Sequence, residues 1–190
     1  MGELTELLAA ARSGRAAVVD RIVTLTYREL HGIAHQRLRY APKVTMLDTT
    51  ALVHECYLRL VKLGELNTAD RAHFLAYAAR VMRSIIVDIA REQLTARRGG
   101  DAKHVTLVTD VSADSPDGEL EVVRVNDALE EIGQLDGRLV QVVEMKYFAG
   151  MTHEEIALAL DVNERTVRRD WEKARVLLHE LLTNPAAQKS

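Results

Sequence analysis

The sequence of 190 residues has little of what several classes of protein require. Its single cysteine, Cys56, excludes an intramolecular disulfide framework and a cysteine-rich zinc module. No 18 apolar residues run together, so we expect no membrane insertion, and the amphipathic N-terminus does not have the pattern of a signal peptide. From these absences we expect a soluble protein located in the cytoplasm.

Aromatic residues make up only 4% of the sequence, which also has only 3 prolines and 10 glycines. The most common residues include Ala, Leu, Val, Glu and Arg, and most of these favour helices. The 47% of hydrophobic and 28% of charged residues are typical of a globular protein with a buried core. No glycine-rich phosphate loop, Ser/His/Asp set or pair of acids with a defined geometry stands out, so we predict neither an enzyme nor a bound cofactor.

Apolar residues recur at helical spacing in two groups of segments, which predicts an all-α fold. The helices are expected at about 4–11, 15–40, 70–98, 119–132, 136–148, 152–160 and 163–182, with a further one running from a cap at Asp48 or Thr49 to just before Gly64. Between the two groups, Gly, Pro, Ser and Asp interrupt the pattern. We therefore predict two small helical domains, 1–100 and 119–185, with an acidic flexible linker at 101–118 and a tail at 186–190.

Charge is unevenly distributed between these segments. Residues 1–100 carry 15 Lys and Arg against 10 Asp and Glu, residues 101–136 carry 2 against 10, and residues 137–190 carry 8 of each. The overall charge of −3 does not by itself indicate a nucleic-acid partner. The acidic linker either shields a basic face of the first domain or is simply solvated.

The strongest local motif is a helix-turn-helix between Thr152 and Arg169. Thr152 and Glu155 have the spacing of a capping box. Asp161 stands at the turn, where a left-handed backbone is needed and Asp is tolerated, and Asn163 is placed to cap the second helix. Together these signals predict two short helices that meet at a tight turn.

The second helix of this motif carries a polar face suited to DNA. An α-helix fits the major groove, where Arg and Lys bind guanine edges or phosphates. The predicted DNA-binding residues are Arg165, Thr166, Arg168, Arg169, Lys173 and Arg175. The alternative is a surface helix whose charges are only solvated.

Two blocks of sequence together are similar to one family. Residues 135–152 with the helix-turn-helix resemble region 4 of bacterial sigma factors. Upstream, Asp48–Leu60 resembles region 2.2 and Phe74–Asp88 resembles regions 2.3–2.4. Because no third domain lies between the blocks, the chain resembles the compact extracytoplasmic-function (ECF) group of the sigma-70 family.

The resemblance implies a transcription initiation factor that binds core RNA polymerase and promoter DNA. Region 2 would dock on the polymerase clamp and help to open the minus-10 element, and region 4 would read the minus-35 element. On the helix that faces the opened strand, the resemblance places Tyr77, Arg80, Arg83 and Ser84. An aromatic ring can stack on an unpaired base and arginines can follow phosphates, although Tyr77 and Ser84 could equally be packing residues.

Region 2.2 departs from the family pattern, because Thr49, Thr50 and Ala51 stand where further carboxylates are usual. The residues expected to contact polymerase are Asp48, Thr49, Thr50, Leu52, Val53 and Glu55. A phosphothreonine would restore negative charge at a helix N-terminus, where it is favoured. We therefore hypothesise that a Ser/Thr kinase activates the protein at Thr50, or less favourably at Thr49; the alternative is that both threonines only cap the helix.

Other interpretations stay open beside this one. An anti-sigma factor is the more usual restraint in the ECF group. A sigma-like decoy would bind polymerase or a partner without initiating, and a simple helix-turn-helix regulator would lack the block at 48–88. His31 and His35 lie one turn apart without further ligands, so no metal site is predicted. Cys56 is expected to be a small buried hydrophobe.

Overall fold

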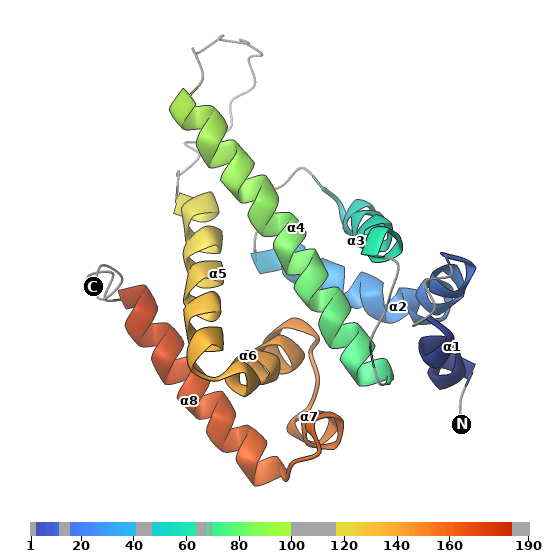
Figure 1. The fold of residues 1–190 in the computed structure, drawn as a ribbon. Helices are drawn as coiled ribbons and strands as arrows, with labels where there is room; N and C mark the ends of the chain where they lie inside the picture. The colour runs from blue at the N-terminus through green and yellow to red at the C-terminus, as the bar shows by residue number, and fades with distance from the viewer. Residues whose placement is uncertain are drawn as a thin grey trace.

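The computed structural model describes residues 3–11, 16–40, 47–63, 68, 70–99 and 117–183. Its elements are α1 (Glu3–Ala11), α2 (Ala16–Tyr40), α3 (Thr49–Leu63), α4 (Arg71–Gly99), α5 (Asp117–Leu135), α6 (Gly137–Val143), the π-helical turn η1 (Glu144–Phe148), α7 (His153–Leu160) and α8 (Glu164–Thr183) (Figure 1). All secondary structure in these ranges is helical, which confirms the predicted all-α fold. Residues 101–116 of the predicted linker and the tail at 186–190 lie outside the described residues.

Aspartates begin several of these helices. The first N–H groups of a helix have no partner within it, and a side-chain oxygen just before the helix supplies one. Asp48 Oδ1 accepts from Ala51 N at 2.8 Å, and Asp70 Oδ1 accepts from His73 N at 3.0 Å. Of the two predicted caps for α3, Asp48 is therefore the one that acts, and Thr49 is the first helical residue.

The long helix α4 runs through the middle of the molecule, with α3 on one side, α5 on the other and α2 crossing behind it (Figure 1). The helices form two groups along the chain, α1 to α4 and α5 to α8. Fully buried side chains from both groups belong to one continuous apolar cluster, among them Leu8, Ile22, Leu30, Leu52, Leu60, Phe74, Met82, Leu129, Ile132 and Leu139. Cys56 is buried in the same cluster, as predicted, and burial raises the pKa of its thiol to about 12. The two groups of helices thus share a core in this arrangement.

Two further expectations concern the described residues. No helix in the described ranges is both long enough and apolar enough to span a lipid bilayer. In the same ranges, no three His, Cys, Asp or Glu side chains gather where a metal ion would bind. The ring of His31 instead lies 5.9 Å from the ring of Tyr27.

Candidate nucleic-acid and polymerase interfaces

The helix-turn-helix has the local geometry that its sequence predicts. Thr152 Oγ1 accepts from Glu155 N at 3.2 Å while Glu155 Oε2 accepts from Thr152 N at 2.8 Å, which is the reciprocal capping box. Asp161 has φ 52° and ψ 47°, the left-handed turn that sets the angle between α7 and α8. Asn163 Oδ1 then accepts from Thr166 N at 2.8 Å and caps α8. The predicted cap, turn and second cap are all confirmed.

The inner side of the motif is apolar and rests on α4. Ile156 and Val167 are fully buried and hold α7 against α8. The same cluster contains Ala76 of α4 together with Val142 and Met145. Small side chains such as Ala76 let helices approach closely, so the motif lies directly on α4.

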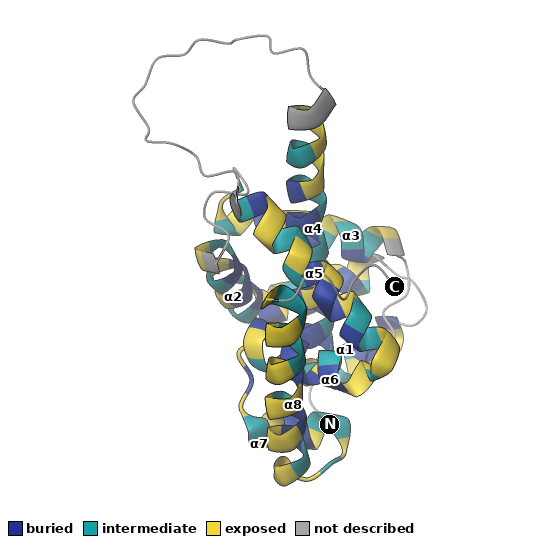
Figure 2. Ribbon diagram, turned by 90° about the vertical axis from the view of Figure 1, so that its left-hand side faces the viewer, coloured by how far each residue is buried: buried dark blue, intermediate teal, exposed yellow. Residues whose placement is uncertain are grey.

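The outer side of α8 is polar and exposed (Figure 2). Five of the six predicted DNA-binding side chains are exposed there: Arg165, Arg168, Arg169, Lys173 and Arg175. Thr166 is half-buried, and its hydroxyl donates to Asn163 Oδ1 at 3.0 Å. Arg168 pairs with Glu164 at 2.6 Å, but exposed pairs of this kind contribute little and separate readily. The structure therefore gathers these side chains on one accessible face.

A buried carboxylate on the opposite face of α8 was not anticipated from the sequence. Asp170 accepts from Arg138 Nε at 2.7 Å, and this hydrogen bond raises the pKa of Arg138. Trp171 is half-buried and packs against both apolar clusters. The pair and the indole together orient the exposed face of α8.

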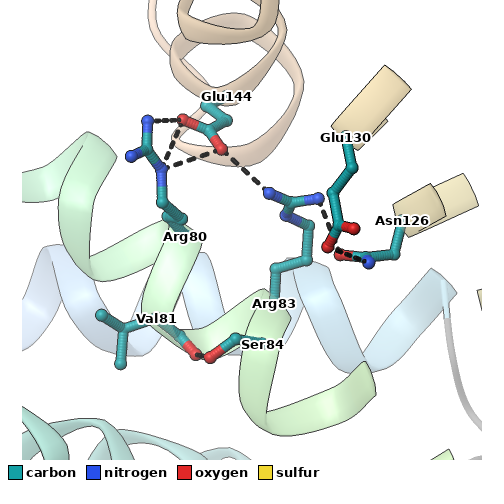
Figure 3. Close-up of polar contacts among 7 residues, drawn as sticks. All are labelled: Arg80, Val81, Arg83, Ser84, Asn126, Glu130 and Glu144. Carbon is teal, nitrogen blue, oxygen red and sulfur yellow. Dashed lines mark hydrogen bonds and ion pairs between the residues drawn. The ribbon is translucent and has the colours of Figure 1, made fainter. Parts of the chain in front are cut away.

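On α4, Arg80 and Arg83 share one carboxylate from the other group of helices (Figure 3). Arg80 Nε lies 2.9 and 3.0 Å from the two oxygens of Glu144, and its Nη2 lies 2.6 Å from Oε2. Arg83 Nη2 donates to Glu144 Oε1 at 3.0 Å, and its Nη1 donates to Asn126 Oδ1 at 3.0 Å. The Glu144 side chain is only 2% exposed, so the carboxylate is almost fully covered.

The other two residues predicted to face the opened strand lie differently. Ser84 accepts from Arg59 Nη1 at 2.7 Å and donates to Val81 O, away from Glu144 (Figure 3). Tyr77 is half-buried and packs against the core. The structure thus brings Arg80 and Arg83 together at Glu144, but it does not place Ser84 with them.

A third arginine approaches the same place from α2. The guanidinium of Arg37 lies 3.5 Å from the centre of the Phe148 ring, and that of Arg83 lies 5.7 Å from it. Burial lowers the pKa of Arg37 to about 9, with a further contribution from the charge of Arg83. Hydrogen bonds that Arg80 donates to Glu144 instead raise the pKa of Arg80. Burial lowers the pKa of Arg83 as well.

The face of α3 predicted to meet polymerase is divided between surface and core. Asp48, Thr50 and Glu55 are exposed and Thr49 is half-buried. Leu52 and Val53, which were also expected to contact polymerase, are buried in the core. A side chain packed there cannot reach a partner while α3 keeps this position, so these two residues hold α3 against the core.

An all-helical chain with a capped helix-turn-helix and an exposed basic second helix belongs to the class of helix-turn-helix proteins. The family model "ECF sigma factor" matches residues 1–184, and the chain belongs to that family. Among solved structures, the chain is similar to CnrH in complex with the cytosolic domain of CnrY, with 22% sequence identity, a TM-score of 0.41, and coverage of 94% of this chain and 96% of that one. No curated protein matches the chain significantly.

Proposed function

We propose that this ECF sigma factor binds core RNA polymerase through α3, reads the minus-35 promoter element with α8, and helps to open the minus-10 element with α4. The observation that carries the proposal is the basic, exposed face of α8 on a helix-turn-helix whose caps and turn are complete. Exposed arginines there have the reach and charge to bind base edges and phosphates. The opposite face of α8 is anchored in the core through Val167 and Ala174, which gives the reading face a fixed orientation.

Run-off transcription tests this proposal. Core polymerase with the purified protein is given fragmented genomic DNA of the source organism, and the 5′ ends of the transcripts are sequenced. We expect discrete start sites that share two upstream elements, and we expect Arg168→Ala with Arg169→Ala to lose them. Arg21→Ala is the matched control, because Arg21 is also an exposed arginine in a surface ion pair, with Glu3, but lies on α2. Binding to core enzyme without any discrete transcripts would instead identify a sigma-like decoy.

The proposal includes a phosphorylation switch on α3. Asp48 already caps this helix through Ala51 N, so the Thr50 hydroxyl is not needed for capping. Thr50 is exposed in the first helical turn, where the helix dipole favours negative charge. A phosphate at Thr50 adds about −1.5 to −2 charges to a surface that has fewer carboxylates than is usual in the family. Added negative charge strengthens docking to a cationic partner.

The switch is tested by transcription with the unmodified protein, the protein phosphorylated at Thr50, and the variants Thr50→Glu and Thr50→Ala. We expect phosphorylation to raise transcription by about tenfold or more, which corresponds to about 1.4 kcal/mol of binding free energy. Thr50→Glu should recover part of the increase, and Thr50→Ala should lose it. Thr24→Glu is the matched control, because Thr24 is also an exposed threonine but lies on α2. Equal transcription by all Thr50 forms would reject the switch and favour restraint by an anti-sigma factor.

A further inference from the structure

Three arginines from two helices surround the turn η1. Arg80 and Arg83 hold the carboxylate of Glu144, at distances of 2.6 to 3.0 Å. The guanidinium carbon of Arg37 lies 3.5 Å from the centre of the Phe148 ring. One short turn of the second group of helices thus fills a cationic site that is made by α2 and α4.

The site contains more positive charge than this turn neutralises. Arg37 is only 6% exposed, and its Nε and Nη2 atoms have no hydrogen-bond partner among the described residues. Arg83 Nε likewise has none within those ranges. Glu130 lies near Arg83 and hydrogen-bonds Asn126, but it does not pair with Arg37. Burying a guanidinium without its hydrogen bonds is costly, and η1 leaves these three donors without a hydrogen-bond partner.

We infer that Arg37, Arg80 and Arg83 form one binding site for single-stranded DNA, and that η1 occupies this site in the closed protein, with Glu144 in the place of a phosphate and Phe148 in the place of a base. A guanidinium fork binds phosphate oxygens in the same bidentate manner as carboxylate oxygens. A guanidinium plane also stacks on a base as it does on an aromatic ring. The inference deepens the proposed function and rests on it, and it adds Arg37, which neither the sequence motifs nor the family resemblance indicated.

According to the inference, η1 and single-stranded DNA compete for the same three arginines. A strand can bind the three arginines only after η1 has moved away from α4. Weakening the hold on η1 should therefore increase affinity for single strands, and removing Arg37 should reduce it once the site is open. A purely structural ion pair would give neither result.

The test measures binding of the full chain, without polymerase, to a short fluorescein-labelled oligothymidine by anisotropy. Glu144→Gln keeps the size of the side chain but removes its charge, and we expect it to tighten binding by at least about tenfold. Adding Arg37→Ala should reverse the gain, because it removes the guanidinium that stacks on a base. Asp127→Asn is the matched control, because it breaks the half-exposed pair of Asp127 with Arg91 between α5 and α4; we expect it to change affinity by less than about twofold.

A second variant tests the inference even where Glu144→Gln fails to fold. Phe148→Leu removes the ring from Arg37 but leaves an apolar side chain, and it should also tighten binding. If both folded variants bind the oligothymidine as the wild type does, or if Arg37→Ala leaves affinity unchanged in the Glu144→Gln protein, the inference is wrong. Failure of the proposed function is distinguishable, because it would appear as absent run-off transcription while the changes in strand binding persist.

Discussion

Arg80 and Arg83 share Glu144, and the structure predicts that the arginine with fewer bonds to this carboxylate contributes more to stability. Arg80 makes three close contacts with it, whereas Arg83 makes one. The side chain of Arg80, however, is 49% exposed, and that of Arg83 is 14% exposed. Water competes for the Arg80 contacts and screens them, but it reaches Arg83 much less.

The expected magnitudes follow from this difference in exposure. Replacement by methionine keeps the aliphatic stem of each arginine and removes only the charged group. Arg83→Met removes charge-assisted hydrogen bonds to two buried acceptors, Glu144 and Asn126, so we expect it to lower the free energy of unfolding by about 3 kcal/mol. Arg80→Met removes a half-exposed pair and leaves Arg83 on the carboxylate, so we expect a loss of about 1 kcal/mol.

Urea unfolding of the full chain, followed by far-UV circular dichroism, measures both losses. Arg91→Met is the control, because Arg91 makes a half-exposed pair with Asp127 between α4 and α5, and it should cost less than about 1 kcal/mol. Each variant is also combined with Glu144→Gln, which gives the coupling energy of each arginine with the carboxylate. An Arg80→Met protein that is as destabilised as Arg83→Met would refute the argument that burial outweighs the number of contacts.

Three further predictions concern the helix-turn-helix and the closed arrangement. Thr152→Ala should lower the free energy of unfolding by about 1 kcal/mol in urea unfolding, and Thr152→Ser should restore most of it, because only a side-chain oxygen is needed to accept from Glu155 N. Hydrogen bonds from Thr152 lower the pKa of Glu155, so the stabilisation from this carboxylate should be complete above its unfolded-state pKa and be lost as the pH falls through the lower folded-state value; thermal melts of the wild type and Glu155→Gln across acidic pH should converge at the low end. Cross-linking the double variant Arg91→Cys, Asp127→Cys with a short cleavable bis-maleimide should abolish run-off transcription, and cleavage of the linker should restore it, with Cys56 staying unmodified because it is buried.

Most of the fold was predictable from local sequence patterns. Helix ends are decided by neighbouring residues, so the capping box at Thr152, the turn at Asp161 and the cap at Asn163 were all predictable from spacing. The apolar stripes were predictable for the same reason, since side chains three and four positions apart share one helix face. The sequence allowed either Asp48 or Thr49 to cap α3, and the structure assigns the cap to Asp48.

The candidate strand-binding site was only partly predictable, because its partners are distant in the sequence. Glu144 pairs with Arg80 and Arg83, which precede it by 64 and 61 positions, and periodicity contains no information about such pairing. One signal was present, since Glu144 interrupts an apolar run that faces the core. A buried acid needs a buried cation, so this residue indicated that an arginine must meet it. It did not indicate which one, and nothing in the sequence pointed to Arg37.

The two predicted DNA-contacting surfaces differ in exposure while the two groups of helices share one core. The basic face of α8 is exposed although α8 is part of the shared core, because its buried apolar residues, Val167 and Ala174, lie on the other face. On α4, Arg83 is covered by η1, and Arg80, although its side chain is 49% exposed, is paired with Glu144 of η1, which belongs to the same group of helices as α8. Duplex DNA therefore has access to α8 before a single strand has access to α4. If separation of the halves requires polymerase, the covered site becomes available only where a polymerase is already bound, and free protein is kept from binding unpaired DNA elsewhere.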